Sequence, residues 1–271
     1  MFFVNSAAPA YGQKVIRGNT VSGNATFSDN MIELSGVSLA IAGETLLRDV
    51  NLAVGRGEIV AVMGPSGEGK SVLLKIIAGL LEPSSGNVAI RGRTRSELTK
   101  FERRELGRET GMLFQRNALF DSLTSLENVS FPQIETLGRS AEESNKQSHE
   151  LLAAVGLADA AERYPSEISG GMQKRLGIAR ALSLEPKLIL YDDPTAGLDP
   201  ITSRKIIRLI AELQVRDKST VLVVTNEIAR AFQIADRIAF VFKGEVIVTG
   251  SVEETRAHTD TRVAKFLRGQ A

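Results

Sequence analysis

The stretch that decides the fold is "VMGPSGEGKSVLLKIIAGL", residues 62–80. It has the spacing G-x-x-x-x-G-K-S, which begins at Gly64 and ends at Ser71. A β-rich apolar run, "GEIVAVMG", leads into it and an apolar helical pattern follows. This context separates a phosphate-binding loop from a chance glycine-rich turn. The stretch therefore predicts a P-loop between a buried strand and a helix.

The residue types in this loop match what phosphate binding requires. Phosphate oxygens need several N–H donors at close range, and glycines at 64, 67 and 69 let the backbone turn and approach without a Cβ. The helix that begins near Lys70 adds the positive end of its dipole. Lys70 is expected to reach the β- and γ-phosphates, and the Ser71 hydroxyl to bind Mg²⁺. The predicted nucleotide contacts in this loop are Gly64, Pro65, Ser66, Gly67, Glu68, Gly69, Lys70, Ser71 and Val72.

A second stretch, "LILYDDPTAGLD" at residues 188–199, ends an apolar run with two adjacent carboxylates. A P-loop needs a carboxylate-bearing strand beside it. Asp192 is predicted to hold Mg²⁺, and Asp193 to act as a general base or to orient the attacking water. The alternative is a plain Asp-Asp-Pro turn, which the presence of the P-loop disfavours.

Composition narrows the class of protein. The 271 residues are 43% apolar and 24% charged, with a net charge of +1. This is an ordinary globular composition, and it gives no electrostatic argument for binding nucleic acid. The absence of cysteine excludes disulfides and thiolate metal sites. Because no apolar run approaches the ~20 residues of a membrane span, any role at a membrane would depend on a partner.

The pattern along the chain predicts three parts. Residues 1–30 lack any period and are expected to form a mobile extension. Residues 31–250 begin with two alternating, antiparallel strands, "MIELSGVSLAI" and "LLRDVNLAV", and then alternate buried strands ("KLILY", "TVLVVT", "IAFVF") with helices such as 203–215. This indicates an α/β fold with a mostly parallel core sheet, an antiparallel β subdomain and a helical insertion at about 116–185. A polar tail, 251–271, follows.

A Ser-Gly-Gly sequence, Ser169 to Gly171, precedes an amphipathic helical pattern in "ISGGMQKRLGIARAL". A hydroxyl, two small residues and a helix N-terminus together form a second anion site. One chain thus carries two phosphate cradles about a hundred residues apart. The alternative is that Ser169 only caps the helix.

Five motifs in order now identify a family. The Walker A stretch "GPSGEGKS", Gln115, the signature "ISGGM", the Walker B stretch "LILYDD" and the D-loop "AGLD" resemble those of ATP-binding cassette (ABC) ATPases over about residues 31–250. The resemblance implies an ABC-type P-loop fold that binds ATP and Mg²⁺. It also implies a head-to-tail homodimer in which ATP lies between the Walker A loop of one copy and Ser169, Gly170 and Gly171 of the other. Gln115 would sense the γ-phosphate and Mg²⁺, and Asp199 would lie at the dimer seam.

A narrower resemblance rests on "LFQRNALFDSLTSLENVSFP" and the tail "DTRVAKFLRG". These stretches are similar to the ATPase subunits of Mla-type phospholipid-trafficking transporters, which work with MCE (mammalian cell entry) proteins. The resemblance implies permease partners, an MCE-domain lipid-binding partner and a cytoplasmic position on the inner face of the cytoplasmic membrane. The segment after Gln115 would receive the permease.

Three positions depart from the family pattern. Asp193 stands where the catalytic Glu is usual, Asn226 where the switch His is usual, and Ile41 where an aromatic residue stacks on adenine. Asn226 can donate a hydrogen bond but cannot carry a proton charge, and Ile41 covers adenine without the π-stacking contribution. We expect a functional but slow ATPase, unless the local backbone carries the shorter Asp193 forward.

Three functions compete at this point. The first is the energy-supplying subunit of a phospholipid transporter, the second is the same subunit for another solute, and the third is a slow nucleotide-dependent switch outside transport. The tail adds a weaker hypothesis, because its apolar residues need cover that the neighbouring subunit would supply. These residues are Val263, Phe266 and Leu267.

Overall fold

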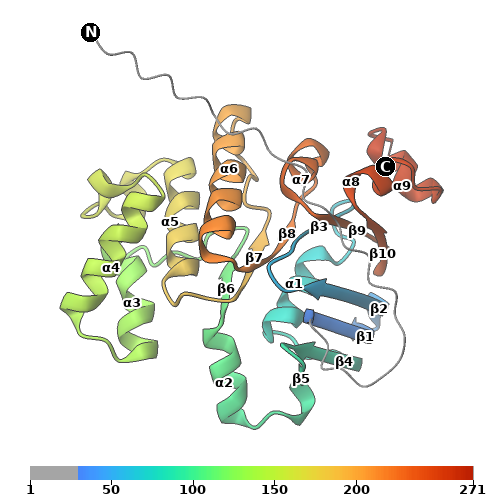
Figure 1. Ribbon diagram of the computed structural model, residues 1–271, viewed down its shortest axis with the longest axis horizontal. Coiled ribbons are helices and arrows are strands. Elements are labelled where there is room, and N and C mark those ends of the chain that lie inside the picture. Colours follow the sequence, from blue (N-terminus) through green and yellow to red (C-terminus); the bar gives the residue numbers. More distant parts are fainter. Residues whose placement is uncertain (1–29, 271) are drawn as a thin grey trace.

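The computed structural model describes residues 30–270 (Figure 1). The predicted extension, residues 1–30, lies outside the described residues except for Asn30, which begins the first strand. The described chain forms two sheets and a set of helices in an α/β arrangement.

The central sheet has six strands in the order β10-β9-β3-β8-β7-β6. All neighbours are parallel except β10, which runs antiparallel to β9. β3, β7 and β8 are buried along their whole length, because helices cover both faces of the sheet. The predicted, mostly parallel core is confirmed. Its strands are β3 (Ile59–Met63), β6 (Thr110–Leu113), β7 (Leu188–Asp192), β8 (Thr220–Val224), β9 (Arg237–Phe242) and β10 (Glu245–Gly250).

A smaller antiparallel sheet packs beside the core in the order β2-β1-β4-β5. Its strands are β1 (Asn30–Ile41), β2 (Glu44–Gly55), β4 (Ser85–Ile90) and β5 (Arg93–Thr94). The two alternating stretches of the sequence pair with each other as β1 and β2, as predicted. Helix α1 (Lys70–Ala78) lies between this sheet and the core (Figure 1), and its Leu73, Leu74 and Ile77 are fully buried there.

The carbonyl of Leu46 in β2 lies where the small sheet closely approaches the core. A Cβ on Gly69 would lie 2.6 Å from this oxygen, and one on Gly244 would lie 2.8 Å from it. The backbone N–H of Arg48 also donates to the Gly244 carbonyl at 2.8 Å. Two glycines that are far apart in the chain therefore accommodate one carbonyl oxygen.

The segment expected to be helical, about 116–185, contains three α-helices and, among its residues, no strand. They form the group at the left of Figure 1. Thr124 and Ser140 begin two of them with capping boxes, in which each side chain accepts from the N–H of a Glu three residues on. The helices are α3 (Ser125–Leu137), α4 (Ala141–Ala154) and α5 (Gly170–Leu182).

The remaining helices pack around the two sheets. They are α2 (Lys100–Arg108), α6 (Pro200–Asp217), α7 (Ile228–Ile234), α8 (Val252–Arg256) and α9 (Thr261–Leu267), with 3₁₀ turns η1 (Arg95–Glu97), η2 (Ala158–Ala160) and η3 (Pro165–Glu167). Within residues 30–270 we find no helix with the length and apolar character to cross a membrane.

The tail corrects one expectation. Val263 and Phe266 are buried within their own chain, and Leu267 packs against the same core cluster. The ring of Phe266 meets Phe240 edge-on with centroids 5.6 Å apart, and Phe242 at 6.4 Å. The premise that the apolar residues of the tail need a neighbouring subunit is therefore wrong, because they already pack against the core of their own chain.

Candidate nucleotide-binding site

The P-loop connects β3 to α1 and has the glycine-only geometry that its sequence predicts. Gly64, Gly67 and Gly69 have φ values of 137°, 85° and 104°. A Cβ on Gly64 would lie 2.2 Å from the carbonyl oxygen of Val241 in β9. The loop thus needs glycine at 64 both for its backbone conformation and for the close approach of β9.

Lys70 begins α1 and turns back over the loop. Its Nζ donates to the carbonyls of Gly64 at 2.7 Å and Pro65 at 2.6 Å, and only 7% of the residue is exposed. Burial lowers the pKa of Lys70, and the nearby carboxylates of Asp193, Glu68 and Asp192 oppose that shift. A buried ammonium beside backbone N–H groups favours anions such as phosphate.

The two predicted magnesium ligands on different elements lie together. The Ser71 hydroxyl, in the first turn of α1, donates to Oδ1 of Asp192 at the end of β7, at 2.8 Å. Asp192 is only 5% exposed. This hydroxyl and carboxylate are hard oxygen donors of the kind that Mg²⁺ takes from proteins while phosphates and water complete its shell. The residues therefore fit the ion that the sequence predicts.

Asp193 and Asn226 lie at the carboxyl ends of two neighbouring strands. Asp193 has φ 47°, and its N–H donates to the Val224 carbonyl at 3.0 Å. Asn226 follows β8, and its Nδ2 donates to Oγ of Ser66 in the P-loop at 3.2 Å. The predicted base and the predicted switch residue thus both stand where the carboxyl ends of β7 and β8 meet the phosphate loop.

The charges around Asp193 oppose one another. Burial raises the pKa of the Asp193 carboxyl, and the Lys174 ammonium lowers it more than any other charge does. Asp192 and Glu227 raise this pKa further, while Lys70 lowers it. A carboxyl with a raised pKa is a better proton acceptor than an ordinary Asp, which is the property a general base needs.

The signature residues form a separate site. Ser169 caps α5, with its Oγ accepting from the N–H of Met172 at 3.3 Å. Ser169, Gly170 and Gly171 line a cavity of about 570 Å³ together with Asp199, which caps α6. No P-loop residue lines this cavity. Within the described chain the two phosphate cradles therefore remain apart, as expected if each completes a site in a different copy.

The structure places two further predicted residues at exposed positions. Gln115 follows β6 and is exposed, and Ile41 ends β1 with 48% of its surface exposed. Sequence reasoning missed Lys174, which is only 4% exposed and donates to the carbonyl of Gln115 at 2.6 Å. The available signal was its spacing, because Lys174 shares a helix face with the buried Gly177 and Ile178.

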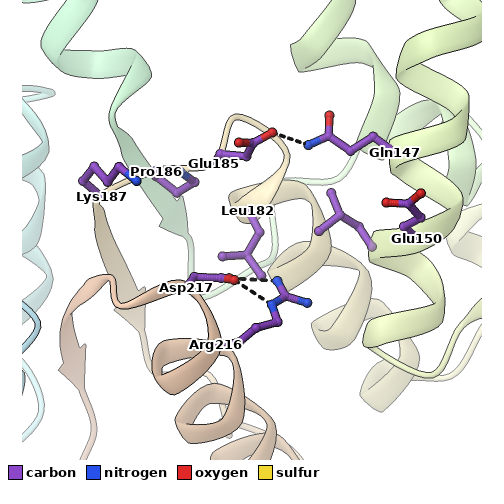
Figure 2. A pocket seen from close by; sticks show the side chains of 9 residues that line it. Gln147, Glu150, Leu182, Glu185, Pro186, Lys187, Arg216 and Asp217 are labelled. Atoms are coloured by element: carbon purple, nitrogen blue, oxygen red, sulfur yellow. Dashed lines mark hydrogen bonds and ion pairs between the residues drawn. The ribbon is translucent and has the colours of Figure 1, made fainter.

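Figure 2 shows a different hollow, of about 310 Å³, between α4 and the base of the core. Pro186 and Lys187 line it just before β7 begins, whereas Asp192 ends that strand. The hollow therefore lies at the amino ends of the parallel strands, whereas the P-loop lies at their carboxyl ends. A hydrogen bond from Gln147 of α4 to Glu185, 2.7 Å long, spans its rim. It is not the nucleotide site.

A P-loop, a carboxylate-bearing parallel strand and a second Ser-Gly-Gly cradle on a helical insertion define a nucleotide-hydrolysing cassette. The chain belongs to the ABC transporter family, whose profile matches residues 47–196, more than half of its length. It is an ABC ATPase, and the nucleotide of this family is ATP.

Individual relatives support this assignment. The chain is 41% identical over 221 residues to the glutamine transport ATP-binding protein GlnQ of Escherichia coli, covering 82% of this chain and 91% of that protein. It is 39% identical over 258 residues to the chloroplastic protein TRIGALACTOSYLDIACYLGLYCEROL 3 of Arabidopsis thaliana, covering 89% and 74%.

Among solved structures, the dimeric post-hydrolysis state of the ATP-binding cassette MJ0796, bound to ADP and Pi, has a TM-score of 0.74 and 38% identity. The match covers 80% of this chain and 96% of that one. The expected α/β ABC fold is confirmed. ABC cassettes of this kind form dimers.

Proposed function

We propose that this chain hydrolyses ATP to power a membrane transporter, and that the cargo is phospholipid. In this proposal two copies form a head-to-tail dimer on the inner face of the cytoplasmic membrane, beneath permease subunits and an MCE-domain partner. The observation that carries the ATPase part is the hydrogen bond between Ser71 and Asp192 beside the P-loop, because it joins the phosphate cradle to the carboxylate strand.

The proposed roles follow from position. The P-loop N–H groups and Lys70 hold the β- and γ-phosphates, and Lys70 exchanges its carbonyl partners for phosphate oxygens. Ser71, Asp192 and Gln115 would hold Mg²⁺, which neutralises phosphate charge when bound.

Asp193 accepts a hydrogen bond from the attacking water and takes its proton. Asn226 donates to a γ-phosphate oxygen, and the Ser169-Gly170-Gly171 end of the second copy closes the site.

The short side chain of Asp193 leads us to propose slow turnover. A catalytic group misplaced by ~1 Å costs on the order of 10²-fold in rate, and Asp is one methylene shorter than Glu. The left-handed backbone at Asp193 is the feature that could compensate.

Asp193→Glu should accelerate steady-state hydrolysis if side-chain length is limiting. An unchanged or lower rate, with ATP binding intact, would show that the backbone already places the carboxylate.

An exposed aromatic pair supports docking of a membrane subunit. Phe120 and Phe131 are each 39% exposed, and their rings meet edge-on with centroids 5.1 Å apart. The Arg180 guanidinium lies over Phe120 at 4.6 Å. Phe120 follows Gln115 closely in the chain, and this apolar surface with one cation suits an amphipathic helix that carries an acidic residue.

The phospholipid part of the proposal rests on sequence likeness. The stretch 113–132 resembles Mla-type ATPases, and one relative carries a glycolipid in its name. The second candidate is an importer subunit for an amino acid, which the likeness to GlnQ favours.

Purification of the chain from native membranes in mild detergent separates these candidates. A multi-span permease with an MCE-domain protein and bound phospholipid would support the lipid proposal. A permease with a solute-binding protein would support the importer. A preparation without a membrane partner would refute both and leave a nucleotide-dependent switch.

A further inference from the structure

Helix α5 is hydrogen-bonded to the segment that follows β6. Lys174, Gly177 and Arg180 are spaced three apart, so each is the neighbour of the next on the helix surface. Lys174 Nζ donates to the Gln115 carbonyl at 2.6 Å, and Arg180 donates to the carbonyl of Ala118. Between them, a Cβ on Gly177 would lie 2.6 Å from Cδ1 of Leu113, the last residue of β6, and 3.5 Å from Cβ of Asn117 in the segment. The helix therefore contacts this segment over two successive turns.

The segment itself has a strained backbone. Asn117 and Ala118 are consecutive non-glycine residues with φ values of 60° and 52°. Such conformations persist where the surrounding structure holds them. The bond from Arg180 to the Ala118 carbonyl and the bond from Lys174 to the Gln115 carbonyl hold the segment at both ends. The position of Gln115 is thus tied to the position of α5.

Lys174 also lies near the carboxylates of its own nucleotide site. Burial lowers the pKa of the Lys174 ammonium, and the nearby carboxylates of Asp193 and Asp192 oppose that shift. The helix that carries it begins at Ser169, Gly170 and Gly171, three to five residues earlier. Helix α5 therefore contacts the Gln115 carbonyl of one nucleotide site through Lys174, and its N-terminus carries the Ser-Gly-Gly cradle for the other.

We propose that Lys174 is a positioning residue that couples the two nucleotide sites of the dimer. A shift of Gln115 as it engages nucleotide moves Lys174, and α5 carries that shift to the Ser-Gly-Gly end offered to the second copy. The inference rests on the head-to-tail dimer of the proposed function. Coupling of this kind is reciprocal, so both sites gain from it equally in binding free energy.

The test compares Lys174→Met with Lys174→Arg. Methionine keeps a long apolar side chain and loses the donor, whereas arginine restores a cationic donor. We would measure the Hill coefficient of hydrolysis against ATP concentration, the affinity of the isolated chain for a fluorescent ATP analogue, and the thermal midpoint. The wild type should approach the two-site limit of about 2.

The expected result has three parts. Lys174→Met should lower the Hill coefficient to about 1 and the maximal rate by about tenfold or more, with analogue affinity unchanged. Lys174→Arg should recover cooperativity. Lys187→Met removes an exposed lysine next to β7 and should match the wild type. If Lys174→Met does not fold, Lys174→Gln replaces it. Glutamine removes the charge, and its amide nitrogen ends one atom short of the position of the lysine nitrogen.

Two outcomes overturn the inference separately from the proposed function. Wild-type cooperativity in Lys174→Met would overturn it. A lower thermal midpoint and rate with an unchanged Hill coefficient would show a structural role only. A wild-type chain without an ATP-dependent dimer would instead refute the dimer itself, and the inference with it.

Discussion

Replacing Gly64 with alanine tests the P-loop geometry most directly. The new Cβ would lie 2.2 Å from the Val241 carbonyl oxygen, where an ordinary C···O contact is about 3.3 Å. The loop or β9 must therefore move by about 1.1 Å. The φ of 137° adds strain of about 1–3 kcal/mol, and the overpacking adds a similar amount. Gly64→Ala should lose about 2–6 kcal/mol of unfolding free energy.

Gly67→Ala is the matched control. Gly67 also has positive φ, 85°, but nothing lies within 4 Å of its Cβ position. It should lose only the backbone contribution, about 1–3 kcal/mol. A displacement near 1 Å also lowers a reaction rate about 10²-fold, so hydrolysis should fall further in Gly64→Ala than in Gly67→Ala.

Urea denaturation followed by circular dichroism gives the free energies, since the chain has no tryptophan to report on unfolding. Nucleotide titration and steady-state hydrolysis give the functional effect. Equal losses in the two variants would refute the reasoning, because they would show that the approach of β9 to Gly64 adds nothing to the cost of the backbone conformation.

Two further predictions concern the tail and the metal ligands. Phe266→Ala should destabilise the chain by about 3 kcal/mol in urea denaturation, because the ring is 9% exposed and packs on Phe240; sedimentation should show the dimer unchanged, and a weaker dimer at wild-type stability would contradict packing within one chain. In the wild type, chelating Mg²⁺ should weaken ATP binding. Ser71→Ala should bind ATP with about the same affinity with and without Mg²⁺, and a wild-type response to chelation in this variant would argue against Ser71 as a ligand.

Most of the fold could be predicted because its strands are continuous apolar runs and its P-loop has a rigid glycine spacing. The region 82–113 could not. β6 has only four residues, and its Gly111 is explained by a contact across the fold, since a Cβ there would meet the Ala181 carbonyl at 2.3 Å. In α2 only Leu106 is buried, so its apolar period is too weak to detect.

The candidate site was likewise only partly predictable from the sequence. Residues that act through a local loop, such as Lys70 and Ser71, follow from spacing alone. Lys174 does not, because its partner is a backbone carbonyl 59 positions away in the chain. The tail was misread for a related reason. The aromatic residues that cover Phe266 lie on β9, and nothing in the tail's own sequence points to them.

The carbonyl of Leu46 has a consequence for engineering and for divergence. Gly69 belongs to the P-loop and Gly244 to the turn between β9 and β10, yet both leave room for one oxygen of the small sheet. A graft of that sheet from another cassette would succeed only if the recipient kept both glycines. Substitution of either glycine during evolution should likewise be accompanied by a change in the backbone of β2. Gly69, Gly244 and Leu46 are therefore expected to change together.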